Sequence, residues 1–116
     1  SIPTSLGQED HVSMGSISGR KLHQILDNLE YILAVELLTA SQGFEFRRPL
    51  KTSPILELVL EAVRATAGYA SEDRIFAKDI ESLRSFIRNG TINEITENNA
   101  TRLGIGLNES YPNFQL

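Results

Sequence analysis

A run of 35 residues without proline, at positions 10–44, constrains the fold of this chain more than any other feature. Leucines recur within it at intervals of four, three, four and four residues, which is the spacing of one face of an α-helix. These leucines are Leu22, Leu26, Leu29, Leu33 and Leu37. At about 1.5 Å per residue, the run predicts a helix roughly 50 Å long, about three times the average length in globular proteins.

Small side chains crowd the first third of this predicted helix. They are Ser13, Gly15, Ser16, Ser18 and Gly19. Two interpretations are open: a frayed helix start, or a surface against which another helix packs closely inside a larger bundle. Each glycine in a helix interior costs about 1 kcal/mol relative to alanine, whereas small side chains let another backbone approach. We favour the packing interpretation.

A basic connection at positions 42–53 follows the long helix. Gly43 suits the C-terminus of that helix, and Arg47, Arg48 and Lys51 make the segment positively charged. A solvated loop is the favoured interpretation, and binding of a phosphate or carboxylate is the alternative.

Two shorter helices are expected next. Ser53 and Pro54 suit the N-cap and the first position of a helix over residues 54–68. A third helix is expected over residues 79–89, with Gly90 as its C-cap.

The last part of the chain divides into a short helix and a tail. Thr91 and Glu94 fit a capping box, which predicts a fourth helix over residues 91–98. Residues 98–116 contain Asn, Gly and Pro with few apolar side chains, and we expect an irregular tail. Since no strand pair or internal repeat is evident, the sequence predicts an all-α fold with a helical region at 1–97.

The composition excludes several classes of protein. The chain has 116 residues, a length that suits one domain, and its net charge is −4. The absence of cysteine excludes disulfides, cysteine zinc sites and thiol nucleophiles, and the two histidines, His11 and His23, lead us to predict no metal site. Dispersed basic residues argue against a nucleic-acid partner, and the lack of a long apolar run argues against a membrane span. The N-terminus does not resemble a signal peptide, so a cytoplasmic location is expected.

The densest group of reactive side chains lies at the start of the long helix, at Gln8, Glu9, Asp10 and His11. A carboxylate at this end of a helix is stabilised by the helix dipole, so Asp10 fits a simple cap. The functional alternative is a carboxylate that points into a cleft to bind a cation or exchange a proton. Neighbouring side chains on a helix point about 100° apart. Glu9 and Asp10 therefore cannot share one target, and their spacing does not choose between them.

The same region resembles the C-terminal signature of the histidine ammonia-lyases, a branch of the aromatic amino acid ammonia-lyase family. The run that carries the resemblance is Gln8-Glu9-Asp10-His11-Val12-Ser13-Met14-Gly15. The similarity continues through Leu33-Ala34-Val35-Glu36-Leu37-Leu38, Gln42-Gly43, Phe46-Arg47, Pro49-Leu50-Lys51-Thr52-Ser53 and Asp73-Arg74-Ile75-Phe76-Ala77. It covers roughly residues 1–90. Leu6-Gly7 departs from the Ala-Asn that family members commonly have there.

The resemblance implies a helical-bundle lyase fold of the aspartase/fumarase-like type. In that fold long central helices assemble into a homotetramer, and each active site draws residues from several subunits. It further implies that this chain corresponds to about the last quarter of such an enzyme. The helices of the N-terminal region would then be its partners.

The resemblance also implies the elimination of ammonia from L-histidine to give urocanate. The electrophile of the family is 4-methylideneimidazol-5-one, formed from an Ala-Ser-Gly tripeptide. This chain has no such tripeptide, and its nearest string is Ile17-Ser18-Gly19. The chain alone is therefore expected to be inactive.

By motif position, Glu9 corresponds to the active-site glutamate that faces the substrate imidazole. A carboxylate there accepts an imidazole N–H and orients the ring. Gln8 is a second substrate-site candidate, while Asp10 and His11 would serve packing and capping. Two other functions stay open: a non-catalytic helical assembly module, and a related lyase or aminomutase acting on phenylalanine or tyrosine.

Overall fold

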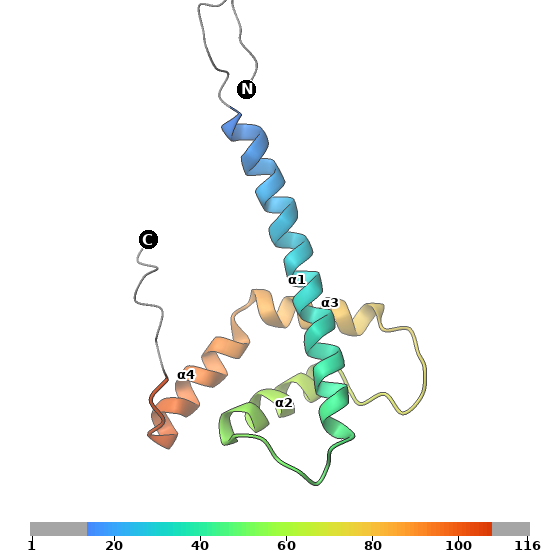
Figure 1. The fold of residues 1–116 in the computed structure, drawn as a ribbon, viewed down its shortest axis with the longest axis vertical. Coiled ribbons are helices and arrows are strands. Elements are labelled where there is room, and N and C mark those ends of the chain that lie inside the picture. Colours follow the sequence, from blue (N-terminus) through green and yellow to red (C-terminus); the bar gives the residue numbers. More distant parts are fainter. Residues whose placement is uncertain (1–13, 108–116) are drawn as a thin grey trace, which may run out of the picture.

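The structure, a computed structural model, describes residues 14–107, which form four α-helices and no strand within that range (Figure 1). In chain order the helices are α1 (Gly15–Glu45), α2 (Pro54–Thr66), α3 (Ala77–Arg88) and α4 (Thr91–Leu103). The predicted all-α fold is confirmed. In the part of the chain that the structure describes, none of the helices is long and apolar enough to cross a membrane.

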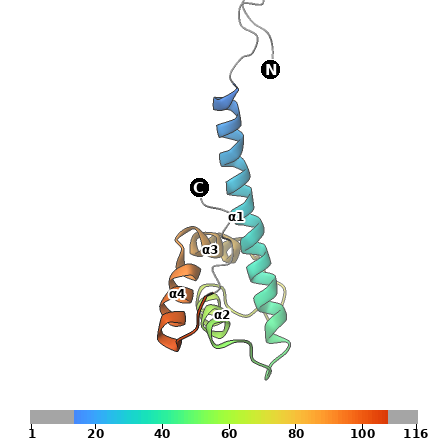
Figure 2. The same ribbon diagram turned by 60° about the vertical axis from the view of Figure 1, so that its left-hand side comes forward.

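The long helix α1 has 31 residues, and its N-terminal half extends beyond the other helices (Figures 1 and 2). The other three gather around its C-terminal half. The helix begins at Gly15 rather than at the expected position 10, and positions 10–13 lie outside the described residues. It also continues past Gly43, which lies inside it. The chain leaves the helix through a tight turn in which the Arg47 N–H donates to the Phe44 carbonyl at 2.9 Å.

The start of α2 confirms the prediction from its sequence. The Ser53 side-chain oxygen accepts a hydrogen bond from the Leu56 N–H at 3.4 Å, and Pro54 occupies the first helical position. This arrangement satisfies one of the free N–H groups of the first turn. The helix ends at Thr66, two residues before the expected position 68, because Ala67 adopts an extended conformation.

Two residues, Asn89 and Gly90, connect α3 to α4. Gly90 has a φ of +72° and is the N-cap residue of α4, while its N–H donates to the Ile87 carbonyl of α3. The predicted capping box of Thr91 and Glu94 is wrong, because Thr91 already lies inside the helix and no side chain caps it. The left-handed glycine stops α3 and lets the chain turn directly into the next helix.

The helix α4 runs to Leu103, five residues past the predicted end at position 98. Polar side chains at its C-terminal end bond back to the helix, as the Asn99 amide donates to the Ile95 carbonyl at 2.8 Å. Ala100 is buried, and α4 packs against α2. This packing outweighs the weak helix propensity of the Asn- and Thr-rich sequence. Gly104, with a φ of +64°, then terminates the helix.

A small apolar core lies where α1, α2 and α3 meet. Its buried members are Ala34, Leu38, Val59, Val63, Ala67 and Leu83. Around them lie half-buried side chains of α1, α3 and α4. The core therefore holds the C-terminal half of α1 against the shorter helices and leaves its N-terminal half outside.

Two glycines should respond oppositely to alanine. Gly90→Ala is expected to lower the free energy of unfolding by about 1 kcal/mol, because a Cβ is unfavourable at positive φ. Gly43→Ala is expected to raise it by up to about 1 kcal/mol, because Gly43 is an exposed helical residue with open space around it. Urea unfolding followed by circular dichroism measures both, and equal effects would contradict the left-handed assignment of Gly90.

Candidate functional site

The predicted site residues Gln8 and Glu9 lie outside the described residues, as do Asp10 and His11. Their roles therefore stay predictions. The described chain begins just after this motif, at Met14, which is the N-cap residue of α1 and makes no side-chain cap. Within residues 14–107, no group of three His, Cys, Asp or Glu side chains is placed to hold a metal ion.

The string Ile17-Ser18-Gly19 does not fit the family's electrophile. It forms part of the first turns of α1, where the Ser18 N–H donates to the Met14 carbonyl at 3.0 Å. A tripeptide that cyclises cannot keep this helical hydrogen bonding, and the string also lacks the alanine. That this chain does not supply the electrophile stays a prediction from its sequence.

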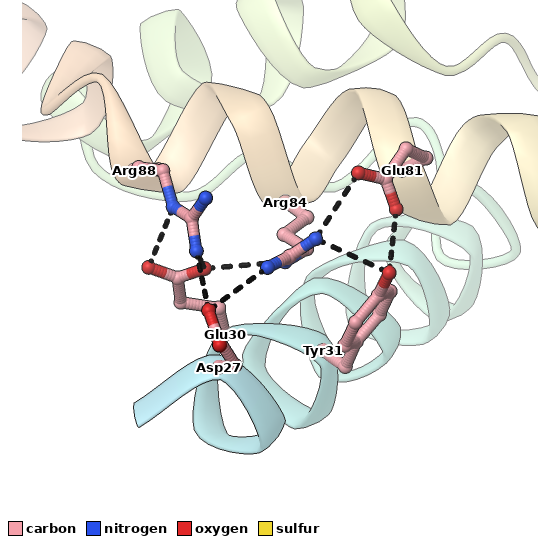
Figure 3. Close-up of polar contacts among 6 residues, drawn as sticks. All are labelled: Asp27, Glu30, Tyr31, Glu81, Arg84 and Arg88. Atoms are coloured by element: carbon pink, nitrogen blue, oxygen red, sulfur yellow. Dashed lines mark hydrogen bonds and ion pairs between the residues drawn. The ribbon is translucent and has the colours of Figure 1, made fainter. Parts of the chain in front are cut away.

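The densest group of charged side chains in the described region joins α1 to α3 (Figure 3). We call it the α1–α3 polar cluster. Its members are Asp27, Glu30 and Tyr31 of α1, and Glu81, Arg84 and Arg88 of α3. On α3 the members follow one another by three and four residues, and on α1 Glu30 and Tyr31 follow Asp27 by three and four residues, so on each helix they lie on neighbouring positions of the surface. The sequence analysis did not identify this cluster; its only signal is the matching spacing of acids on one helix and arginines on another.

Arg84 lies at the centre of the cluster. Its guanidinium contacts Asp27 at 3.1 Å, Glu30 at 3.1 Å and Glu81 at 3.2 Å. It also donates to the Tyr31 hydroxyl at 3.2 Å and lies 4.3 Å from the centre of that ring. Only 15% of its side chain is exposed. The fork of the guanidinium is therefore fixed by partners from both helices.

Arg88 and Tyr31 complete the network. Arg88 donates from Nε to Glu30 at 2.9 Å and from Nη2 to Asp27 at 2.7 Å. The Tyr31 hydroxyl donates to Glu81 at 2.9 Å. The hydrogen bond from Arg88, together with those of Arg84, holds the pKa of the Glu30 carboxyl below its usual value. Each carboxylate in the cluster is paired, so the group is suited to holding two helices together rather than to proton transfer.

The lowered pKa of Glu30 predicts an acid-sensitive contact. The unfolded chain binds a proton at Glu30 more readily than the folded chain, so stability falls as the pH drops below about 4.5. The Glu30→Gln variant should lose less stability than the unmodified chain between pH 5 and pH 3, as measured by urea midpoints. Glu97→Gln, at an exposed position of α4, is the control for the loss of one carboxylate outside the cluster. An unchanged slope in Glu30→Gln would contradict the pairing.

A second group of polar contacts joins the basic connection to the ends of α1 and α2. Arg48 pairs with Glu45 at 3.3 Å and with Glu57 at 3.1 Å. The Thr52 N–H donates to Glu57 at 2.8 Å, and this bond, with Arg48, holds the pKa of Glu57 below its usual value. Arg48 therefore pairs with carboxylates of its own chain, and binding of a phosphate or carboxylate by the connection stays a prediction.

Apolar hollows flank the C-terminal half of α1. One, of about 190 Å³, lies between α1 and α2 and includes Phe44 and Leu56. Another, of about 340 Å³, is lined by Leu33, Ile87 and Ile92 of α1, α3 and α4. Further toward the N-terminus, large apolar side chains of α1 are more than 35% exposed, among them Leu22, Ile25, Leu26, Leu29 and Ile32. An apolar surface this long, on a single helix, is typical of contacts with further helices.

Comparison with known proteins identifies the class. The family model for aromatic amino acid lyases matches residues 1–65, more than half of the chain, and the chain belongs to this family. Similar curated proteins are histidine ammonia-lyases. That of Legionella pneumophila (strain Corby) is 51% identical over 87 residues, which are 75% of this chain and 17% of the relative. That of Desulfotalea psychrophila is 45% identical over 95 residues, or 82% of this chain and 19% of the relative.

A solved structure agrees with these matches. The crystal structure of histidine ammonia-lyase from Trypanosoma cruzi aligns with a TM-score of 0.78 and 39% identity, over 90% of this chain and 22% of that one. The resemblance and the helical lyase fold expected from the sequence are thereby confirmed. The chain spans about a fifth, or less, of the length of the relatives it matches.

Proposed function

We propose that this chain is part of a histidine ammonia-lyase, an enzyme that eliminates ammonia from L-histidine to give urocanate. The observation that carries the proposal is the likeness to a histidine ammonia-lyase structure over nine-tenths of the chain. The Gln-Glu-Asp-His run at positions 8–11 supports the same substrate, because relatives that act on phenylalanine or tyrosine usually differ at the glutamate and the histidine.

Glu9 is the residue to which we assign substrate contact. Its carboxylate accepts an N–H of the substrate imidazole, orients the ring and stabilises positive charge on it. Gln8 hydrogen-bonds beside it and holds that geometry.

The chemistry requires a partner sequence. The electrophile 4-methylideneimidazol-5-one comes from an Ala-Ser-Gly tripeptide, which this chain does not contain. We therefore propose that other sequence supplies it, and that this chain alone is inactive. The exposed apolar face of α1 would pack against those helices and against further copies in a homotetramer, in the cytoplasm.

A hybrid enzyme tests the proposal. In the Legionella pneumophila relative, the matching segment is replaced by this chain, and urocanate formation is followed by its ultraviolet absorbance. The hybrid is expected to convert L-histidine, while the chain alone gives no product. A folded hybrid that converts L-phenylalanine or L-tyrosine but not L-histidine would transfer the proposal to the related lyases. A folded hybrid inactive on all three, or turnover by the chain alone, would contradict it.

A further inference from the structure

We propose that the α1–α3 polar cluster is a brace that sets the direction of α1, and that Arg84 is its central positioning residue. The orientation of α1 is a property of this chain and does not depend on its activity. The consequence for substrate binding rests on the function proposed above.

The position of the cluster along α1 is the first argument. Every residue at positions 14–29 is exposed, and Glu30 is the first half-buried residue in the helix. The next buried residue is Ala34, in the apolar core. Within the described residues, the cluster is thus the contact with the shorter helices that lies furthest toward the N-terminus of α1.

A contact further along a helix fixes its direction more firmly than the core contact does by itself. Ala34 packs in the core with Leu83 of α3, and Asp27 lies about 10 Å further along α1, at 1.5 Å per residue. Ala34, Leu38 and Ser41 are buried and hold the C-terminal half of α1, but with these contacts alone the helix has no support from Ala34 toward its N-terminus. A turn of roughly 10° about Ala34 would displace Gly15, about 28 Å away, by about 5 Å. Displacements of about 1 Å at a reacting group can cost a hundredfold in rate, so a brace here would matter to the motif ahead of Gly15.

The geometry of Arg84 suits orientation better than it suits stability. Exposed ion pairs contribute little to folding, and Asp27 and Arg88 are each more than half exposed. Arg84 is different, because a planar guanidinium held between two helices by Asp27, Glu30, Glu81 and Tyr31 restricts their mutual angle. Figure 3 shows the contacts of Arg84 with Tyr31 and the carboxylates of α1 and with Glu81 of α3. Lysine has no such fork and would restrict the angle less.

The test measures a distance across the brace in the whole chain. Because the chain has no cysteine, spin labels can be attached through Lys21→Cys on α1 and Lys78→Cys on α3, both at exposed positions outside the cluster. Labelled protein is diluted with an excess of unlabelled chain, so that pulsed electron paramagnetic resonance measures only distances between two labels in one molecule. Arg84→Met and Arg84→Lys are compared with Arg102→Met, an exposed arginine of α4 outside the cluster.

A brace predicts one narrow distance distribution in the unmodified background and in Arg102→Met. In Arg84→Met the width should increase at least about twofold while the helical circular dichroism is kept, and Arg84→Lys should lie between. In about 1 M NaCl the Debye length falls to roughly 3 Å. This salt concentration should broaden the distance distribution of the unmodified background but not that of Arg84→Met.

Equal widths in all variants and at both salt concentrations would overturn the proposal. If Arg84→Met fails to fold, the salt comparison on the unmodified chain decides by itself. In the hybrid enzyme, Arg84→Met should lower kcat for L-histidine more than Arg102→Met does. An inactive hybrid with a salt-dependent distance would refute the proposed function and leave the brace intact.

Discussion

Glu9→Ala in the hybrid enzyme is expected to lower kcat for L-histidine by about two to four orders of magnitude. The substitution removes the carboxylate that we assign to the imidazole of the substrate. Without the carboxylate, the imidazole ring is no longer oriented and positive charge on it is no longer stabilised. Both losses raise the barrier of the reaction and therefore lower kcat. Steady-state kinetics on L-histidine measure the effect, with kcat and KM determined separately.

Two neighbouring substitutions separate charge from position. Glu9→Gln keeps the shape and a hydrogen-bond acceptor but loses the charge, so its kcat should lie between those of Glu9→Ala and the unmodified hybrid. Asp10→Asn removes a charge one residue away, at a position to which we assign capping, and should change kcat less than about threefold. Normal turnover by Glu9→Ala, or an equal loss in Asp10→Asn, would refute the role of Glu9.

Local signals in the sequence predicted the elements that depend on local chemistry. The leucine repeat of α1 and the Ser53-Pro54 start of α2 both appear in the structure, because a helical face and an N-cap are defined by residues within a few positions of each other. The Thr91-Glu94 pair had the correct spacing for a capping box and still failed. Gly90 occupies that position with a positive φ, since it must also end α3.

Contacts between distant segments were not predictable in the same way. Arg84 and Glu30 are 54 positions apart, and their pairing depends on how α3 lies across α1. In the sequence, each side of the cluster looks like an ordinary charged face of a helix. The extension of α4 to Leu103 has the same origin, because burial of Ala100 and packing on α2 outweigh a sequence with poor helix propensity.

For the candidate site, the sequence provides the residues and the structure does not describe them. Gln8 and Glu9 were identified from a motif, since a run of side chains ahead of a helix is a sequence property. The structure describes the helix that follows them rather than the residues themselves. What it adds is how α1 is held: by the apolar core around Ala34 and by the arginines of α3.

Mutations in the apolar core and in the polar cluster should affect the free energy of unfolding differently. Leu83 tests the apolar core. Its side chain is fully buried between α1, α2 and α3. Leu83→Ala is expected to lower the free energy of unfolding by about 2–4 kcal/mol, from lost burial and from the cavity left behind. The melting temperature should fall by about 10 °C or more. Leu56→Ala, whose side chain is 54% exposed on α2, is the matched control and should change stability by less than about 1 kcal/mol.

Comparing Leu83→Ala with Arg84→Met distinguishes the role of the apolar core from that of the polar cluster. Leu83 and Arg84 are adjacent on α3, and both contact α1, but one does so through an apolar core and the other through a polar network. Leu83→Ala should therefore weaken the fold cooperatively, as seen by urea unfolding and by loss of helical circular dichroism on heating. Arg84→Met should change both measurements less than Leu83→Ala does, while it frees the direction of α1. If Leu83→Ala proved as mild as Leu56→Ala, the core at Ala34 would not be the contact that holds α1 to the shorter helices.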